Sequence, residues 1–226
     1  MDIAGLNRGL LAERTCGSCP LRGKTFVGAD SWNGQADPAN VLFLGLNPGT
    51  EEARIGLPFV GPSGRFLRMA IGSAPNSGTW AMANSILCST ANETSIPDPA
   101  ACRACCRVNV GQIFKRFLPR VIVPCGNGAS ALFEIKEGIT RAANFWYISR
   151  GKNHKAKAAL VAPILHPSAL IRSGGKSSSK YDGWQTRINE IFKLAKLLEN
   201  GQTPEDILAE LGIKWRGLFG LAWSME

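Results

Sequence analysis

Two short motifs carry side chains that can take part in hydrolysis. GLNPG at 45–49 contains Asn47, and HPS at 166–168 contains His166, one of two histidines in the chain. An amide carbonyl can orient a water molecule, and an imidazole can donate a hydrogen bond to developing negative charge. Both residue types also have ordinary structural uses, because Asn before Pro stabilises turns and histidine caps helices or fills cores. The second histidine, His154, lies among lysines, and we expect it at the surface.

Cysteines form the second chemically distinctive group, at positions 16, 19, 88, 102, 105, 106 and 125. Cys16 and Cys19 have the C-x2-C spacing with which two thiolates bind one metal centre. Further ligands can come from Cys88 or from the 102–106 group, and Cys102-x2-Cys105 can pair with the first two in a zinc site. Thiolates suit zinc and iron–sulfur clusters alike, so spacing leaves both open. Cys125 closes an apolar run and is interpreted as a packed core thiol.

The composition predicts a basic globular protein with a polyanionic partner. The chain has 226 residues, 45% of them hydrophobic, and a formal net charge of +9. This length fits one large domain, or one domain with a small appendage. There is no apolar run long enough for a membrane span and no secretory signal, so we expect an intracellular, cytoplasmic protein. Positive charge attracts phosphates, and basic residues flank HPS at Lys152, Lys155, Lys157, Arg172, Lys176 and Lys180.

The elements that must position these motifs alternate between strands and helices. Short apolar runs at 41–46, 82–87, 121–125 and 159–165 are typical of strands buried on both faces of a mostly parallel sheet. Helical patterns lie between and after them, at 62–74, 99–118, 128–135 and 183–199. Alternation of this kind predicts an α/β layered fold with right-handed crossovers.

The distinctive motifs all fall where such strands end. GLNPG ends the first run, Cys88 follows the second, Cys125 and Gly126 end the third, and HPS follows the fourth. Ligands of open α/β sheets bind beyond the carboxyl ends of the strands. The sequence therefore predicts one site at this edge, built from segments distant in the chain.

The C-terminal part has weaker signals. The stretch 173–180 (SGGKSSSK) is interpreted as a mobile basic loop. Thr203 as N-cap, Pro204 at the first helical position and acids in the first turn predict a short capped helix. The apolar and aromatic tail that follows is expected to pack on the body or to contact a partner. We therefore divide the chain into a domain at 1–200 and a helical, aromatic extension at 201–226.

Taken together, the motifs resemble those of the uracil-DNA glycosylase superfamily, most closely its iron–sulfur branch, known as family 4. The similarity runs from Cys16 to about Leu198. Six segments follow in the same order at compatible spacing: CGSCPLRG at 16–23, VLFLGLNPGTEEARIGLPFVGPSGRFL at 41–67, ANSILC at 83–88, CRVNVGQIFKRFLPRVIVPCG at 106–126, RGK at 150–152 and ILHPSALIRS at 164–173. The resemblance implies a three-layer α/β/α sandwich with a central, mostly parallel four-stranded sheet.

The resemblance also implies a cofactor. It points to a structural 4Fe–4S cluster on Cys16, Cys19, Cys88 and Cys106, with zinc as the alternative. Cys106 is preferred over Cys102 and Cys105 because it stands thirteen residues before Pro119, where this branch places its last ligand. The first motif departs from the branch, which usually has GEAPG where this chain has Leu46 and Asn47. GLNPG instead looks like the GxNPG motif of the mismatch-specific and single-strand-selective glycosylases.

Each site residue then has an implied role in excising a flipped base. Asn47 orients the attacking water and His166 donates a hydrogen bond to uracil O2. Phe59 stacks on the base, Asn84 reads its edge, and Ser168 binds a flanking phosphate. We expect close backbone approach to the DNA or base at Gly45, Gly49 and Gly61, and phosphate attraction by Lys176. Leu170, Ile171 and Arg172 are expected to insert into the duplex, with ordinary packing as the alternative for Leu170 and Ile171. Glu51 and Glu52 are interpreted as helix-start charges, with an influence on the attacking water as the alternative.

The function hypothesis is a monofunctional, monomeric glycosylase that removes uracil from single- or double-stranded DNA. It is monofunctional because neither motif contains a lysine for a Schiff base. Asn47 keeps a broader activity open, on hypoxanthine, xanthine or mismatched thymine. A non-catalytic iron–sulfur protein that binds damaged DNA is the alternative from another class.

Overall fold

The computed structural model describes residues 1–12, 16–75, 77–90, 95–149 and 158–218. At its centre four strands lie side by side in the order β3 (Trp80–Asn84), β2 (Val41–Gly45), β4 (Val121–Pro124) and β6 (Ala159–Val161). All of these neighbours pair in parallel. The four parallel strands predicted from the apolar runs are therefore confirmed, and they form the middle of the sheet.

Three short strands widen this sheet to seven within the described residues. β1 (Asp30–Ser31) pairs antiparallel with β3, β5 (Trp146–Ser149) pairs antiparallel with β6, and β7 (Trp215–Leu218) pairs parallel with β5. The sequence predicted none of these three strands, which lie at the two ends of the strand order.

Alternation along the strands shows that the sheet is buried on both faces. Val41 and Phe43 contribute to one hydrophobic cluster, whereas Leu42 and Leu44 contribute to the other. All four side chains are fully buried. Successive side chains of a strand point to opposite faces, so an unbroken apolar run requires a covering layer on each side.

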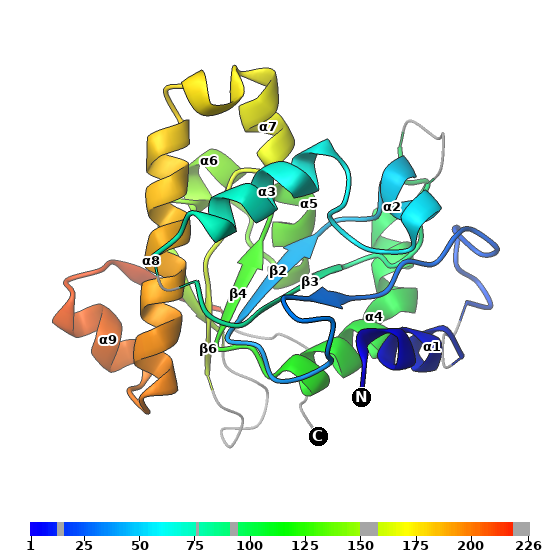
Figure 1. Cartoon of the computed structure of the whole chain (residues 1–226), viewed down its shortest axis with the longest axis horizontal. Helices are drawn as coiled ribbons and strands as arrows, with labels where there is room; N and C mark the ends of the chain where they lie inside the picture. The colour runs from blue at the N-terminus through cyan, green and yellow to red at the C-terminus, as the bar shows by residue number, and fades with distance from the viewer. Residues whose placement is uncertain (13–15, 76, 91–94, 150–157, 219–226) are drawn as a thin grey trace.

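Helices supply both layers. One face is covered by α3 (Pro62–Gly72), α7 (Pro167–Arg172), α8 (Tyr181–Glu199) and α9 (Pro204–Glu210). The other is covered by α1 (Ile3–Ala12) and α4 (Pro99–Phe117), with η1 (Ala131–Phe133) and α6 (Ile139–Ala142) beside them. Figure 1 shows α8 on the opposite side of the sheet from α1 and α4. The α/β/α sandwich is confirmed.

The predicted element boundaries agree less well at three places. The strand predicted at 159–165 is β6 at 159–161. The strand predicted at 82–87 is β3 at 80–84, and the chain leaves the sheet at Ser85. The helix predicted at 128–135 is α5 (Asn127–Ser130) followed by η1, and it ends at Glu134, which has a left-handed backbone with φ 54°. A short α2 (Thr50–Ile55) follows the first motif.

The C-terminal region adds to both the helical layer and the sheet. Thr203 Oγ1 accepts a hydrogen bond from the Asp206 N–H at 3.2 Å, which confirms the predicted cap of α9. The stretch 173–180, predicted to be a mobile loop, contains the turn η2 (Gly175–Ser177) and a 2.9 Å contact between the hydroxyls of Ser173 and Ser178. Residues 219–226, which include most of the aromatic tail, lie outside the described residues.

Among the described helices, none combines the length and the apolar character needed to cross a membrane.

Candidate active site

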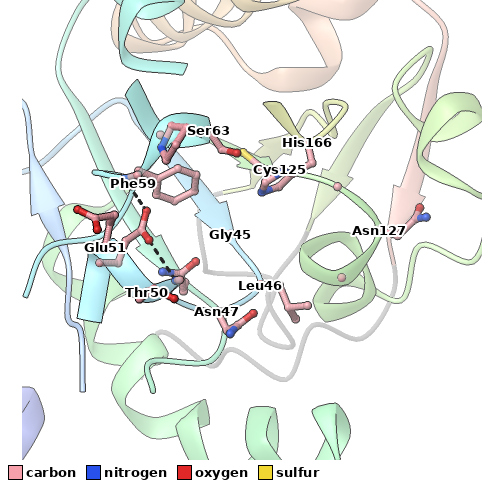
Figure 2. Close-up of a pocket in the computed structure, with 18 residues that line it drawn as sticks. Gly45, Leu46, Asn47, Thr50, Glu51, Phe59, Ser63, Cys125, Asn127 and His166 are labelled. Carbon is pink, nitrogen blue, oxygen red and sulfur yellow. Dashed lines mark hydrogen bonds between the residues drawn. The ribbon is translucent and has the colours of Figure 1, made fainter. Parts of the chain in front are cut away.

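The loops that follow β2, β3, β4 and β6 meet at the carboxyl edge of the sheet, as predicted. They surround a cavity of about 530 Å³, within the range of small-molecule sites. Its walls come from the first-motif loop (residues 45–49) and the start of α2, from the PFVG turn (residues 58–61) and the start of α3, from residues 125–128, and from Asn84 and His166. Figure 2 shows Asn47, Phe59 and His166 on three sides of this space.

Asn47 lies in the first-motif loop and is partly buried at the cavity. Its side-chain nitrogen donates to the Pro48 carbonyl at 3.1 Å, so the turn-stabilising use of Asn before Pro is present. Within the described residues, its side-chain carbonyl accepts no hydrogen bond from the protein. The contact that holds the amide therefore leaves its oxygen available to a water molecule.

His166 is the N-cap of α7. Its Nδ1 accepts the N–H of Ser168 at 3.2 Å and lies 2.7 Å from the Ser168 hydroxyl. An Nδ1 that accepts a backbone N–H carries no proton, so the neutral ring has its hydrogen on Nε2. Burial, and secondarily the charge of Arg172, lowers the pKa of His166 below its usual value, and Glu52 offsets part of this. A neutral imidazole with a free Nε2–H thus lines the cavity.

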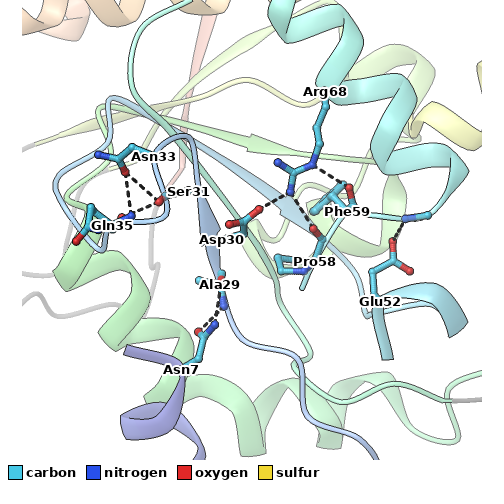
Figure 3. A network of polar contacts seen from close by, with 11 residues as sticks. Asn7, Ala29, Asp30, Ser31, Asn33, Gln35, Glu52, Pro58, Phe59 and Arg68 are labelled. Atoms are coloured by element: carbon cyan, nitrogen blue, oxygen red, sulfur yellow. Dashed lines mark hydrogen bonds and ion pairs between the residues drawn. The ribbon is translucent and has the colours of Figure 1, made fainter. Parts of the chain in front are cut away.

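Phe59 has its ring in the cavity wall and its backbone in the left-handed region, with φ 56°. This conformation costs a non-glycine residue of order 1–3 kcal/mol and needs support from its surroundings. Arg68 provides it, since Nε donates to the Phe59 carbonyl at 3.0 Å and a terminal nitrogen donates to the Pro58 carbonyl at 3.1 Å. Arg68 is paired with Asp30 at 2.5 Å (Figure 3).

Asn84 ends β3 and is only 3% exposed, yet within the described residues its side chain makes no hydrogen bond to the protein. It lines the cavity, where a ligand can satisfy it. Gly45 makes room for it, because a Cβ on Gly45 would lie 2.2 Å from Asn84 Oδ1 and 3.0 Å from Phe59 Cζ. Gly45 therefore leaves room for two side chains of the cavity, and the predicted close approach of the base to its backbone stays a prediction.

Glu52 is the polar residue whose place in the site the sequence did not reveal. It was interpreted as a helix-start charge, and its Oε2 does accept the Gly49 N–H at 3.1 Å at the start of α2. Its Oε1 also accepts the Gly61 N–H at 2.9 Å, from the PFVG turn. Glu51 is the ordinary helix-start charge and pairs with Arg54 at 3.0 Å.

Some of the residues expected to contact DNA are exposed, and others already have hydrogen-bond partners within the protein. Arg172 and Lys176 are exposed and form no ion pair within the described residues. Leu170 is fully buried in the core, so the expectation that it inserts into the duplex was wrong. Ile171, which is 37% exposed, is the apolar residue of this segment that is available for insertion. The Gly61 N–H is occupied by Glu52, and Ser168 contacts His166. Lys152, His154, Lys155 and Lys157 lie outside the described residues, as does the RGK segment at 150–152.

Six of the cysteines gather in a cluster beside the first-motif loop. Cys19, Cys88 and Cys102 are buried in one apolar group, and Cys16, Cys105 and Cys106 pack against it. Helical spacing brings Cys102, Cys105 and Cys106 together on α4, and the Leu87 N–H donates to Cys106 Sγ at 3.4 Å. Burial raises the pKa of Cys106 to about 12. Cys125 is buried elsewhere, as predicted, and also lines the cavity.

Among the described residues, no group of three or more Cys, His, Asp or Glu side chains is placed to hold a metal ion. Leu46 packs both against the cysteine cluster and against Gly128 of α5, and it lines the cavity. The side chain that replaces the Glu of GEAPG therefore forms an apolar partition between the cavity and the cysteines.

Comparison with known families decides what this arrangement is. The family model of the uracil DNA glycosylase superfamily matches residues 32–192. The chain belongs to this superfamily. It is therefore a DNA glycosylase.

The matched residues of this glycosylase include both motifs, the PFVG turn and Asn84. Cys16 and Cys19 precede the match, so membership of the superfamily leaves the N-terminal cysteine pair without assignment. The superfamily match likewise assigns neither the substrate base nor a metal centre.

Proposed function

We propose that this glycosylase hydrolyses the N-glycosidic bond of uracil in DNA after flipping the nucleotide into the cavity. One observation carries the proposal. The unoccupied side-chain carbonyl of Asn47 and the Nε2–H of a neutral His166 line the same cavity as the Phe59 ring and the Asn84 amide. These groups correspond to what uracil cleavage requires: a held water, a donor for the departing base, a stacking surface and a reader of the base edge.

The charge changes of the reaction fit these groups. Bond cleavage leaves positive charge on the sugar and negative charge on uracil O2. Ser168 fixes the ring of His166 through Nδ1, which directs Nε2–H outward without a reorganisation step. Asn47 holds the water through its carbonyl while Pro48 holds its amide. A chain without a lysine in either motif forms no Schiff base, so the product is an abasic site.

The test is a strand-cleavage assay. Purified protein is incubated with end-labelled duplexes containing uracil, hypoxanthine, xanthine or thymine opposite guanine, and then treated with alkali. We expect cleavage at uracil that depends on the alkali step. Cleavage before alkali would contradict the monofunctional mechanism, and no cleavage on any duplex would contradict the enzyme and favour a protein that only binds damage.

A broader substrate range is the second candidate, and Leu46 favours it. This residue places an apolar wall where family 4 has a carboxylate, beside the Asn47 of a GxNPG motif. An apolar wall discriminates weakly between bases of similar shape. Cleavage of hypoxanthine, xanthine or mismatched thymine at rates comparable to uracil would establish this alternative.

We also propose that the cysteine cluster holds the 4Fe–4S group of a family 4 enzyme, through Cys16, Cys19, Cys88 and Cys106. The donor set supports this, because the cluster offers buried thiols in apolar surroundings and Cys106 already accepts a backbone N–H, a contact common to cluster ligands. When bound, the group ties the N-terminal segment to the loop after β3. Brown protein with equal iron and acid-labile sulfide supports the proposal, and colourless zinc-containing protein contradicts it.

A further inference from the structure

The Glu52 carboxylate connects the two loops that form the cavity. Its oxygens accept the N–H groups of Gly49, at 3.1 Å, and Gly61, at 2.9 Å. Gly49 is two residues after Asn47, and Gly61 is two residues after Phe59. A single side chain therefore sets the spacing between the loop that holds the water-orienting amide and the turn that holds the stacking ring.

The two glycines are shaped to this carboxylate. A Cβ on Gly49 would lie 2.8 Å from Glu52 Oε2, and a Cβ on Gly61 would lie 3.1 Å from Oε1. Side chains at these positions would push the carboxylate away from the amides that it accepts. Glycine at positions 49 and 61 therefore leaves room for the Glu52 carboxylate to accept both N–H groups.

The PFVG turn needs this second attachment. Its Phe59 has a strained backbone, and Arg68 holds only the Pro58 and Phe59 carbonyls. The end of the turn that leads into α3 is held by Glu52 through Gly61. With both ends attached, the ring is fixed relative to the body through Arg68 and relative to the first-motif loop through Glu52.

We propose that Glu52 is a positioning residue for base excision, acting through Asn47 and Phe59 without contacting the base. This rests on the function proposed above. Both carboxylate oxygens are engaged by backbone amides, so Glu52 is not a free general base. Loss of the Glu52 carboxylate lets the two loops move apart, which lowers the rate of bond cleavage. The affinity for DNA changes less, because the cations expected to bind DNA, Arg172 and Lys176, lie on α7 and η2.

Three variants separate the parts of this role. Glu52→Gln keeps the shape but can accept from one amide only, since its nitrogen opposes the second N–H. Glu52→Ala removes both contacts, and Glu52→Asp keeps the charge with a shorter reach. Glu199→Gln is the charge-matched control, because Glu199 pairs with Lys196 near the C-terminal end of α8, away from the cavity.

Single-turnover excision of uracil from a duplex is measured on the full-length proteins as purified. We expect Glu52→Gln and Glu52→Ala to lower the maximal rate about 10- to 100-fold, the scale of a small misplacement of reacting groups. We expect the half-saturating enzyme concentration to change less than about 3-fold, Glu52→Asp to fall between, and Glu199→Gln to match the wild type. A Glu52→Gln protein with a cooperative melt and wild-type rate, or a loss confined to half-saturation, overturns the proposal.

A second measurement does not depend on activity. The amide proton resonances of Gly49 and Gly61 are compared in ¹⁵N-labelled wild type and Glu52→Gln, and we expect both to shift. Unchanged resonances overturn the connection itself. If the wild type cleaves no duplex, the proposed function fails. The amide proton shifts of Gly49 and Gly61 still test whether Glu52 connects the two loops. If Glu52→Gln does not fold, Glu52→Asp takes its place in both measurements.

Discussion

At the scale of single residues, the nitrogen and the oxygen of the Asn47 side-chain amide have different roles. The amide nitrogen is bound by Pro48, and the carbonyl lines the cavity. We predict that Asn47→Ala lowers the single-turnover rate of uracil excision about 100-fold or more, because the water loses its acceptor. The melting temperature should fall little, since one local turn contact is lost. An Asn47→Ala protein that excises uracil at the wild-type rate would contradict the assignment.

His166 makes the protein sensitive to acid. Its pKa is lowered in the folded state, so the folded protein resists protonation that the unfolded chain accepts. The stabilising contribution is therefore complete above the unfolded pKa and is lost as pH falls through the folded pKa. We predict that wild-type stability falls more between pH 7 and pH 5 than that of His166→Gln, measured by urea unfolding. Equal falls would show that the imidazole is not the titrating group.

The motifs made most of the site predictable, but the contact between Glu52 and the PFVG turn was not predicted. Asn47, Phe59, Asn84 and His166 all line the cavity, as the motif spacing indicated. The bond from Glu52 to Gly61 spans nine residues across a turn whose path depends on Arg68 and Asp30. Contacts of that kind arise from tertiary geometry, and no local pattern encodes them.

At the scale of elements, α3 is packed against the PFVG turn through Gly64. A Cβ there would lie 2.1 Å from the Phe59 carbonyl carbon and oxygen. We predict that Gly64→Ala lowers the free energy of unfolding by about 1–3 kcal/mol, as overpacking does, and slows excision by moving Phe59. Gly72→Ala, in the same helix with open space around its Cβ, is the control. It should be neutral or slightly stabilising, and equal losses in the two variants would refute the packing argument.

Among the helices, α8 was predictable from sequence, whereas the short helix α7 was not. The pattern at 183–199 gave α8 almost at its observed bounds, because Ile188, Ile191 and Leu198 recur at helical spacing and are buried. Helix α7 has six residues and was interpreted as a duplex-inserting loop. Its cap by His166 and the burial of Leu170 explain why this segment folds back onto the core.

At the scale of the whole molecule, the positive charge should determine how DNA binding depends on salt. Each phosphate contact releases counterions, so the binding constant falls with salt concentration. We predict that Arg172→Ala and Lys176→Ala each lower the slope of log K against log salt by about 1, whereas Lys196→Ala, at the far end of α8, leaves it unchanged. Fluorescence anisotropy with a labelled duplex measures this. Equal slopes in all three variants would place DNA elsewhere on the surface.

The route by which the chain folds follows from the strand order. The walls of the cavity come from segments between Gly45 and His166, and the strands beneath them pair out of chain order. Pairing of distant strands is slow, because loop closure costs entropy before contacts repay it. A nascent chain that ends after β4 has the first-motif loop but neither β6 nor the imidazole. The full set of groups that line the cavity is therefore brought together only when β6 and the segment that carries His166 have joined the sheet.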